Sequence, residues 1–348
     1  MRRRLLRILA LLLAGTVVAL PLAWQNEIER PLLPPGAARQ LLNVPPGATA
    51  DTIARELWAM GHLRHPLLFR ALVHARGAAG RLRAGRYPIE PGLSLEDLLD
   101  RLQRGIAERH DVTIPEGRSI LDIVELAAAQ GVPRAAFLAA VRDPSPVRDL
   151  DPKAADLEGY LFPDTYDVPQ GEEAATALAA RMVQRFRSVV TSELPRIARS
   201  GLTLREVVTL ASIVELETAR EEERSRIAAV FLNRLEKGMR LQTDPTVIYA
   251  LRKAGRWDGN IRKQDLELDS PYNTYRYAGL PPGPIGSPGR AAILAVLEPA
   301  PVDDLYFVSR NDGTHEFSET LTDHERAVDR FQRYRRSMRM PAAAPGGR

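Results

Sequence analysis

The sequence predicts an α+β protein in three parts: a single N-terminal transmembrane helix, a small αβ module and a larger mixed α+β domain. Two observations lead to this fold class. A basic cluster at the N-terminus precedes an uncharged apolar segment, and the rest of the chain alternates helix-period patterns with short strand patterns broken by Gly and Pro. A chain of 348 residues is also long enough for more than one domain.

The predicted domain boundaries follow changes in composition. We expect a cytoplasmic tip and transmembrane anchor at 1–24, a Pro-rich linker at 25–40, the small module with a second small subdomain at 41–148, the larger domain at 149–340 and a disordered tail at 341–348.

The N-terminal segment predicts a membrane anchor. Residues 8–24 carry no charge, and with the two leucines before them they approach the ~20 residues that cross a bilayer as a helix. The basic residues before this run predict a cytoplasmic N-terminus. A cleaved signal peptide is the alternative. Because residues 14–16 and 19–21 make poor cleavage sites, we favour an uncleaved single-pass anchor with the remaining chain exported.

Charge and composition exclude several function classes. The chain has 48 Lys and Arg against 44 Asp and Glu, and the four arginines before residue 8 account for the excess. The exported part is therefore balanced, which argues against a nucleic-acid partner. The absence of Cys excludes disulfides and thiol chemistry. The six His show no metal-ligand spacing, so we expect no metal and no cofactor.

The small module has a simple order of elements. A strand and turn near 44–47 lead into helix patterns at 48–60 and 67–75, a strand at 82–89 and a short helix at 95–102. This layout is similar to that of a LysM-like module. Residues 109–117 repeat the first strand and turn, and we interpret them as a partial internal repeat before helices at 119–130 and 134–142.

Aromatic residues gather where the larger domain begins. Tyr160, Phe162 and Tyr166 lie in a short strand pattern broken by Gly159 and Pro163. Such a strand suits the wall of a groove, and aromatic faces are the usual platform for a sugar ring. Ordinary sheet packing is an equal alternative. Helix patterns follow at 174–190, 203–218 and 221–237, and a hairpin signal at 305–317 precedes a last helix that a capping box at 322–325 would open.

The helix at 203–218 carries the strongest chemical signal. It begins with a capping box and is apolar nearly all round, so it should be buried. Glu215 and Glu217 near its end lie about 200° apart around the axis and cannot share a face. Glu215 falls in one row with Ser212 and Thr218, whereas Glu217 falls nearer the charged turn that follows. We therefore predict that Glu215 faces inward.

Burial would give Glu215 a chemical role. Apolar surroundings raise the pKa of a carboxyl, and a Glu shifted toward about 6 can act as a general acid near neutral pH. The alternative is that Glu215 pairs with an arginine or caps a neighbouring helix. Further along, Gln242 and Asp244 lie at a helix start, and Asn273 and Tyr275 lie in a Tyr-rich loop before a stiff Gly- and Pro-rich segment.

Four stretches together resemble the membrane-anchored endolytic murein transglycosylases of the YceG-like family. They are residues 158–166, 211–218, 231–249 and 272–289, and residues 306–317 fit as well. The resemblance covers nearly the whole chain. It implies cleavage, without water, of the MurNAc–GlcNAc β-1,4 bond within glycan strands, which leaves a 1,6-anhydro-MurNAc end, and a role in terminating nascent glycan elongation.

The resemblance also implies the site and the setting. The family's catalytic acid maps onto Glu215. A single carboxylate suffices if the sugar's own 6-hydroxyl attacks and the same carboxylate then accepts its proton. The expected location is the bacterial inner (cell) membrane with the catalytic part on the periplasmic or outer side, and the expected partners are glycan strands and cell-wall synthases. The residues expected to bind substrate are Tyr160, Phe162, Tyr166, Ser212, Thr218, Gln242, Asp244, Asn273 and Tyr275.

Two alternatives stay open. A hydrolase of the same bond would need a second carboxylate, for which Glu158, Asp164 and Asp244 are candidates. A non-catalytic glycan-binding scaffold of a cell-wall synthesis complex would not need Glu215. His315, on the predicted hairpin, could line the groove, although a surface position is the simpler interpretation.

Overall fold

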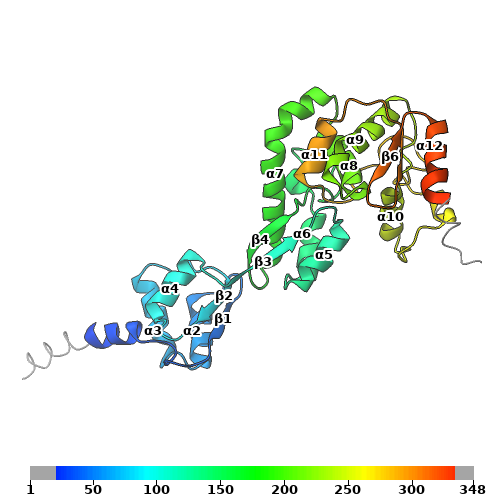
Figure 1. The fold of residues 1–348 in the computed structure, drawn as a ribbon. Coiled ribbons are helices and arrows are strands. Elements are labelled where there is room, and N and C mark those ends of the chain that lie inside the picture. Colours follow the sequence, from blue (N-terminus) through cyan, green and yellow to red (C-terminus); the bar gives the residue numbers. More distant parts are fainter. Residues whose placement is uncertain (1–20, 334–348) are drawn as a thin grey trace, which may run out of the picture. The chain divides into compact units, whose positions relative to one another are not determined.

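The computed structural model describes residues 21–333 as a mixed α+β fold that consists of helices and three small two-stranded sheets (Figure 1). The α+β class predicted from the sequence is confirmed. Between residues 21 and 333, none of the helices combines the length and apolar composition that crossing a bilayer requires. The predicted anchor at 1–24 lies almost entirely outside the described residues, and so does the predicted tail at 341–348.

The chain divides into two compact units. Among residues 21–333, the first contains the chain up to Asp111 with the segments Gly131–Pro133 and Asp167–Ala177, and the second contains Val112–Gln130, Arg134–Tyr166 and the chain from Leu178 onward. Three elements cross this division: the paired strands β3 (Arg109–Ile114) and β4 (Asp164–Pro169), and the long helix α7 (Ala174–Ser200).

The first unit is built around one antiparallel strand pair. Leu42 on the first strand lies opposite Tyr87 on the second, and both side chains are fully buried. The predicted order of strand, two helices and strand is present, and a third helix follows, opened by a capping box between Ser94 and Asp97. The elements are β1 (Gln40–Val44), α2 (Ala50–Ala59), α3 (Pro66–Ala75), β2 (Gly85–Ile89) and α4 (Leu95–Arg104).

The second unit is organised around α8 (Leu204–Glu217), which packs against α9 (Glu221–Glu236) and α11 (Arg290–Leu297). Thr203 caps α8, and Glu206 completes the predicted capping box. The run from Val207 to Val214 is buried without a break, as expected for a helix without a polar face. The remaining helices of this unit are α5 (Ile120–Ala129), α6 (Arg134–Arg142), α10 (Asp244–Lys253) and the short turns η1 (Ser145–Val147) and η2 (Lys263–Glu267).

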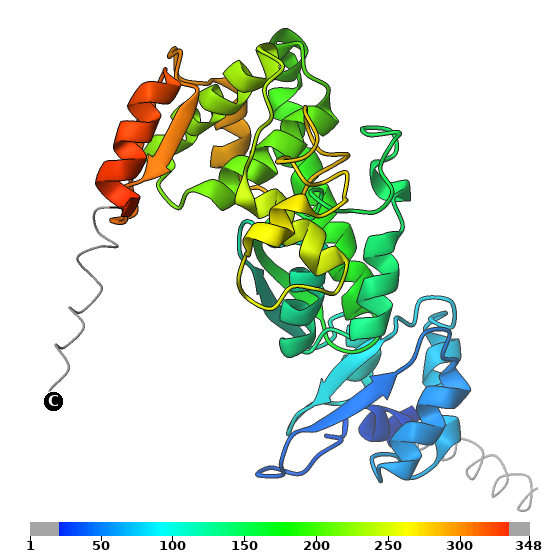
Figure 2. The same cartoon turned by 90° about the vertical axis from the view of Figure 1, so that its right-hand side faces the viewer.

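The predicted hairpin is confirmed near the end of the chain. Strands β5 (Tyr306–Ser309) and β6 (His315–Ser318) pair antiparallel, with Ser309 opposite His315. Helix α12 (Leu321–Val328) packs against both strands, as Figure 2 shows, and η3 (Asp329–Arg333) follows it. The capping box predicted at 322–325 is wrong by two residues, because Thr320 caps α12 and bonds Asp323.

The aromatic stretch also differs from its prediction. No strand covers residues 158–163, and β4 begins only at Asp164. The chain turns at Gly159 with φ at 84°, close against the Gly- and Pro-rich loop. A Cβ at this position would lie 2.4 Å from the Cβ of Pro284. Gly159 therefore lets two distant segments of the second unit meet.

We expect Gly159→Ala to destabilise the protein more than Gly238→Ala does. Both glycines have positive φ, but nothing lies within 4 Å of a Cβ at Gly238. The free energy of unfolding of the control, Gly238→Ala, should fall by about 1 kcal/mol because of backbone strain. That of Gly159→Ala should fall by about 1–3 kcal/mol more because of the clash with Pro284. Urea unfolding of the purified variants measures both. Equal losses of unfolding free energy in the two variants would mean that the loop that contains Pro284 moves aside without a free-energy penalty.

Candidate functional site

A cavity of about 450 Å³ opens in the second unit beside the C-terminal end of α8. Its walls come from α8, α9, the segment that opens α10, the Tyr-rich loop, the hairpin and α12. The volume is in the range of pockets that hold a small ligand. The lining residues are Glu217, Arg234, Leu241, Gln242, Asp244, Tyr275, Phe307, Val308, Ser309, His315, His324 and Val328.

Glu217 is one of two acids that line this cavity, the other being Asp244. Thr243, itself buried, donates its hydroxyl to Glu217 at 2.8 Å. Among the residues that the structure describes, no cation lies within ion-pairing distance of Glu217. Burial raises the pKa of Glu217 to about 7; the Thr243 hydrogen bond opposes the rise, Asp244 adds to it and Arg234 opposes it. A large fraction of this carboxyl therefore keeps its proton near neutral pH.

Glu215 lies in a different environment. Its side chain is 5% exposed, accepts a hydrogen bond from the Arg224 guanidinium at 2.7 Å and another from the Gly289 backbone N–H at 2.9 Å. Burial raises its pKa, while Gly289 and Arg224 oppose the rise and Glu116 adds to it. Glu215 is absent from the cavity wall. Its geometry is the arginine pairing that the sequence left open as the alternative to catalysis.

The predicted orientation of the two acids was therefore incomplete. Glu215 is buried, as predicted, but Glu217 does not lie against the charged turn after α8. The hairpin and the segment before α10 cover that side of the helix and enclose Glu217. The useful signal in the sequence was Arg224, a cation close to Glu215 in the chain at the start of the next helix.

Polar groups on the opposite wall are held in fixed positions. The Tyr275 hydroxyl donates to Asp244 at 2.6 Å. Gln242 lines the cavity with a left-handed backbone, φ 53°, a conformation that is strained for a non-glycine residue. The Arg234 guanidinium donates to the carbonyls of Leu305 and Leu241, each at 2.7 Å, and so places a positive charge in this wall. Of the predicted substrate-binding residues, Gln242, Asp244 and Tyr275 line the cavity.

The other predicted residues lie elsewhere. The core includes Tyr160, Phe162 and Tyr166, which are between 1% and 7% exposed. Their rings offer no open face to a sugar. Ser212 and Asn273 are fully buried. The Ser212 hydroxyl bonds the Thr209 carbonyl and accepts from the Ile285 N–H, whereas Asn273 bonds the carbonyls of Leu266 and Leu268. Thr218 caps the end of α8 and bonds Glu223 at 3.4 Å.

One lining residue, His324, had no predicted role. His324 on α12 stacks on Tyr306 with a centroid distance of 5.1 Å. Burial lowers the pKa of His324, and Arg234 lowers it further. Throughout residues 21–333, no group of three His, Asp or Glu side chains is arranged to hold a metal ion.

The sequence matches a known protein family. A family model described as the YceG-like family matches residues 42–330. The chain belongs to this family. The match includes every residue of the cavity wall.

Relatives in the family carry a functional name. A Bacillus subtilis (strain 168) protein named endolytic murein transglycosylase is 31% identical over 306 residues, which covers 83% of this chain and 84% of that protein. A Streptococcus pneumoniae (serotype 2, strain D39) protein of the same name is 32% identical over 321 residues; the match covers 82% of this chain but only 57% of that protein.

The fold is also similar to a solved one. The crystal structure of a YceG-like protein from Listeria monocytogenes superposes with a TM-score of 0.57 at 30% sequence identity. The superposition covers 83% of this chain and 99% of that one.

The environment of Glu217 predicts a pH-dependent stability. Its pKa of about 7 in the folded protein exceeds the ordinary 4.5, so the native state binds more protons between these values, and wild-type stability falls as the pH rises through them. Glu217→Gln cannot ionise. We expect it to be more stable than wild type by about 1–3 kcal/mol at pH 8 and to differ little at pH 4.5.

Glu215→Gln is the matched control. It leaves Arg224 without its buried partner, so we expect a loss of about 2 kcal/mol or more at pH 8. Urea unfolding at the two pH values measures both variants. Destabilisation of both variants at pH 8 would contradict the assigned environments.

Proposed function

We propose that this protein is an endolytic peptidoglycan lytic transglycosylase. It cleaves the β-1,4 bond between MurNAc and GlcNAc within glycan strands, without water, and leaves 1,6-anhydro-MurNAc ends. Membership of the YceG-like family and the name of its relatives support this activity. The observation that carries the proposal is a carboxyl in the cavity wall, Glu217, whose pKa of about 7 lets it hold a proton.

Glu217, rather than the predicted Glu215, acts as the general acid in this proposal. A catalytic acid needs access to substrate and a proton to give. Glu217 lines the cavity and has no ion-pair partner among the described residues. Glu215 bonds Arg224 and Gly289 and is absent from the cavity wall, and these two partners oppose the rise that burial causes in its pKa.

The chemistry follows from one acid and a sugar that supplies its own nucleophile. Glu217 protonates the glycosidic oxygen of the leaving sugar, which contributes about 10²–10⁴-fold to the rate. The 6-hydroxyl of the MurNAc ring attacks its own anomeric carbon, and holding the ring in the required geometry lowers the barrier further. Gln242, Asp244 and Tyr275 position the sugar groups in the cavity.

One observation favours a second candidate, a muramidase that hydrolyses the same bond. Asp244 lines the cavity together with Glu217, as the second carboxylate of a hydrolase would. The Tyr275 hydrogen bond occupies one of its oxygens. The products separate the two reactions, because hydrolysis gives reducing ends and transglycosylation gives anhydro ends that are one water lighter.

The setting of the reaction is part of the proposal. The basic and apolar N-terminal sequence supports a single-pass anchor in the bacterial inner membrane, with the catalytic unit on the periplasmic or outer side. The strand–helix–helix–strand order of the first unit supports a LysM-like module that binds glycan. An anchored enzyme that cuts inside strands suits the termination of nascent glycans beside cell-wall synthases.

Digestion of purified glycan strands tests this function. We expect mass spectrometry to find 1,6-anhydro-MurNAc ends with wild-type protein and a loss of at least about 10²-fold in cleavage rate with Glu217→Gln. The cleavage rate of Glu215→Gln, assayed below the unfolding temperature of this variant, should stay within about 10-fold of wild type. The substitution removes the partner of Arg224 and therefore affects stability.

Three results would contradict the assignment. Reducing ends would favour the muramidase, and no cleavage by wild type would favour the glycan-binding scaffold. If Glu217→Gln is active and Glu215→Gln is folded but inactive, the catalytic acid is Glu215.

A further inference from the structure

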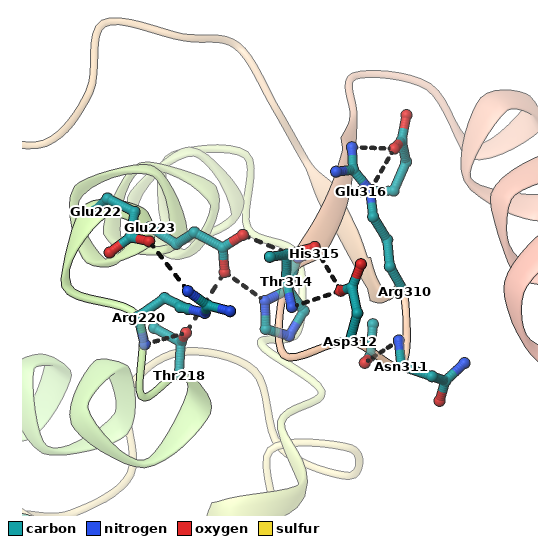
Figure 3. Close-up of polar contacts among 11 residues, drawn as sticks. Thr218, Arg220, Glu222, Glu223, Arg310, Asn311, Asp312, Thr314, His315 and Glu316 are labelled. Carbon is teal, nitrogen blue, oxygen red and sulfur yellow. Dashed lines mark hydrogen bonds and ion pairs between the residues drawn. The ribbon is translucent and has the colours of Figure 1, made fainter.

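The cavity wall contains a histidine, His315, that a carboxylate holds in place. It is the first residue of β6 and lines the same wall region as Glu217. Its ring Nδ1 lies 2.8 Å from Glu223 Oε2, and its backbone N–H donates to Glu223 Oε1 at 2.9 Å (Figure 3). One carboxylate therefore fixes both the backbone and the ring of this histidine.

The contact with Glu223 also fixes where the ring carries its proton. An ionised carboxylate only accepts hydrogen bonds, so in the neutral ring Nδ1 carries the proton and Nε2 carries the lone pair. Burial raises the pKa of Glu223, but the hydrogen bonds from His315 outweigh it and leave that pKa below its usual value. No described residue donates to or accepts from Nε2. The free nitrogen is thus a base without a protein partner.

Glu223 links this base to the end of the acid's helix. The hydroxyl of Thr218, the residue after Glu217, donates to Glu223 at 3.4 Å, and it accepts the Arg220 N–H at 3.0 Å (Figure 3). The end of α8, the first turn of α9 and the start of β6 are joined in this way. Relative motion of the acid and the base is restricted, because the elements that carry them share one network.

The surroundings of His315 are defined by several elements. The Phe307 ring packs edge-on against it, with centroids 5.4 Å apart. The charged and titratable groups that share its cavity wall are Glu217 of α8, Arg234 of α9, Asp244 of α10, Tyr275 of the loop and His324 of α12. Of these, Asp244 is bonded by Tyr275, and Arg234 is bonded to carbonyls.

We propose that His315 is the base that accepts the proton of the attacking 6-hydroxyl. This inference rests on the proposed function. It gives the acceptance of the 6-hydroxyl proton to His315, whereas the sequence had suggested that the catalytic acid itself accepts this proton. Glu217 gives its proton to the leaving oxygen as the C1–O4 bond breaks. The O6–C1 bond forms while the O6 proton passes to His315 Nε2. The imidazolium then returns that proton to the Glu217 carboxylate through the cavity or solvent, so the cycle consumes neither water nor any co-reactant.

Two variants, His315→Ala and Glu223→Gln, test this assignment in the full-length protein with purified glycan strands. His315→Ala should lower kcat by about 10²–10⁴-fold and change KM little, because the base acts in the chemical step. Added imidazole should restore at least about a tenth of the lost rate, since it can enter the space that the side chain leaves. Glu223→Gln should lower kcat by at least about 10-fold, because the ring loses its fixed orientation.

Glu222→Gln is the matched control. Glu222 precedes Glu223 in the same helical turn, is 69% exposed and contacts Arg220 at 3.7 Å. Its replacement should leave kcat within about 2-fold of wild type. His315→Gln provides a second variant that can keep the Glu223 hydrogen bond but is not a base, and thermal unfolding shows whether each variant is folded.

The outcomes separate this proposal from the proposed function. If wild type makes no anhydro ends, both are overturned. If wild type makes them and folded His315→Ala or His315→Gln keeps more than about a third of kcat, only the role of His315 is overturned. A loss that appears in KM alone, or one that imidazole does not relieve, likewise assigns His315 to structure or binding and overturns its role as base.

Discussion

The buried contact of Glu215 with Arg224 and the Gly289 N–H is the interaction on which the second unit depends. It joins the end of α8 to the start of α9 and to the residue that opens α11. A charge removed from water needs such partners, and each partner here lies on a different element. The contact fixes the rotation of α8 about its axis, and this rotation directs the next acid along the helix, Glu217, into the cavity.

Two glutamates separated by one residue thus have different environments because their partners differ. Burial raises the pKa of Glu215, and its two partners, the Arg224 guanidinium and the Gly289 N–H, oppose that rise. Glu217 has a neutral hydroxyl and a nearby carboxylate, and its pKa rises to about 7. The same short helix end makes a buried ion pair through one acid and presents a carboxyl of raised pKa in the cavity through the other.

Much of this architecture is predictable from the sequence because the signals are local. The capping box at Thr203 and the Asn-Asp-Gly turn of the hairpin depend on residues within a few positions, and both are confirmed. The choice between Glu215 and Glu217 is not local. It is decided by Gly289, 74 residues from Glu215, and by Thr243, 26 residues from Glu217. A helix that is apolar all round has no polar face from which to infer these contacts.

The aromatic stretch shows a second limit. Composition cannot tell a ring that faces a groove from one in the core, and here Tyr160 hydrogen-bonds the buried Asp151 with its hydroxyl. In contrast, Gln242, Asp244 and Tyr275 lie at a helix start and in a turn-rich loop, and their side chains line the cavity. Exposure is easier to predict where local backbone geometry decides it than where the packing of distant segments does.

The position of the hairpin in the chain has a consequence for biosynthesis. Glu217 lies on a helix made well before His315 and α12, which supply the last wall of the cavity. During translation, α8 and its ion pair can assemble while that wall is still inside the ribosome. A nascent chain therefore carries Glu217 before the hairpin and α12 have completed the lining of its cavity.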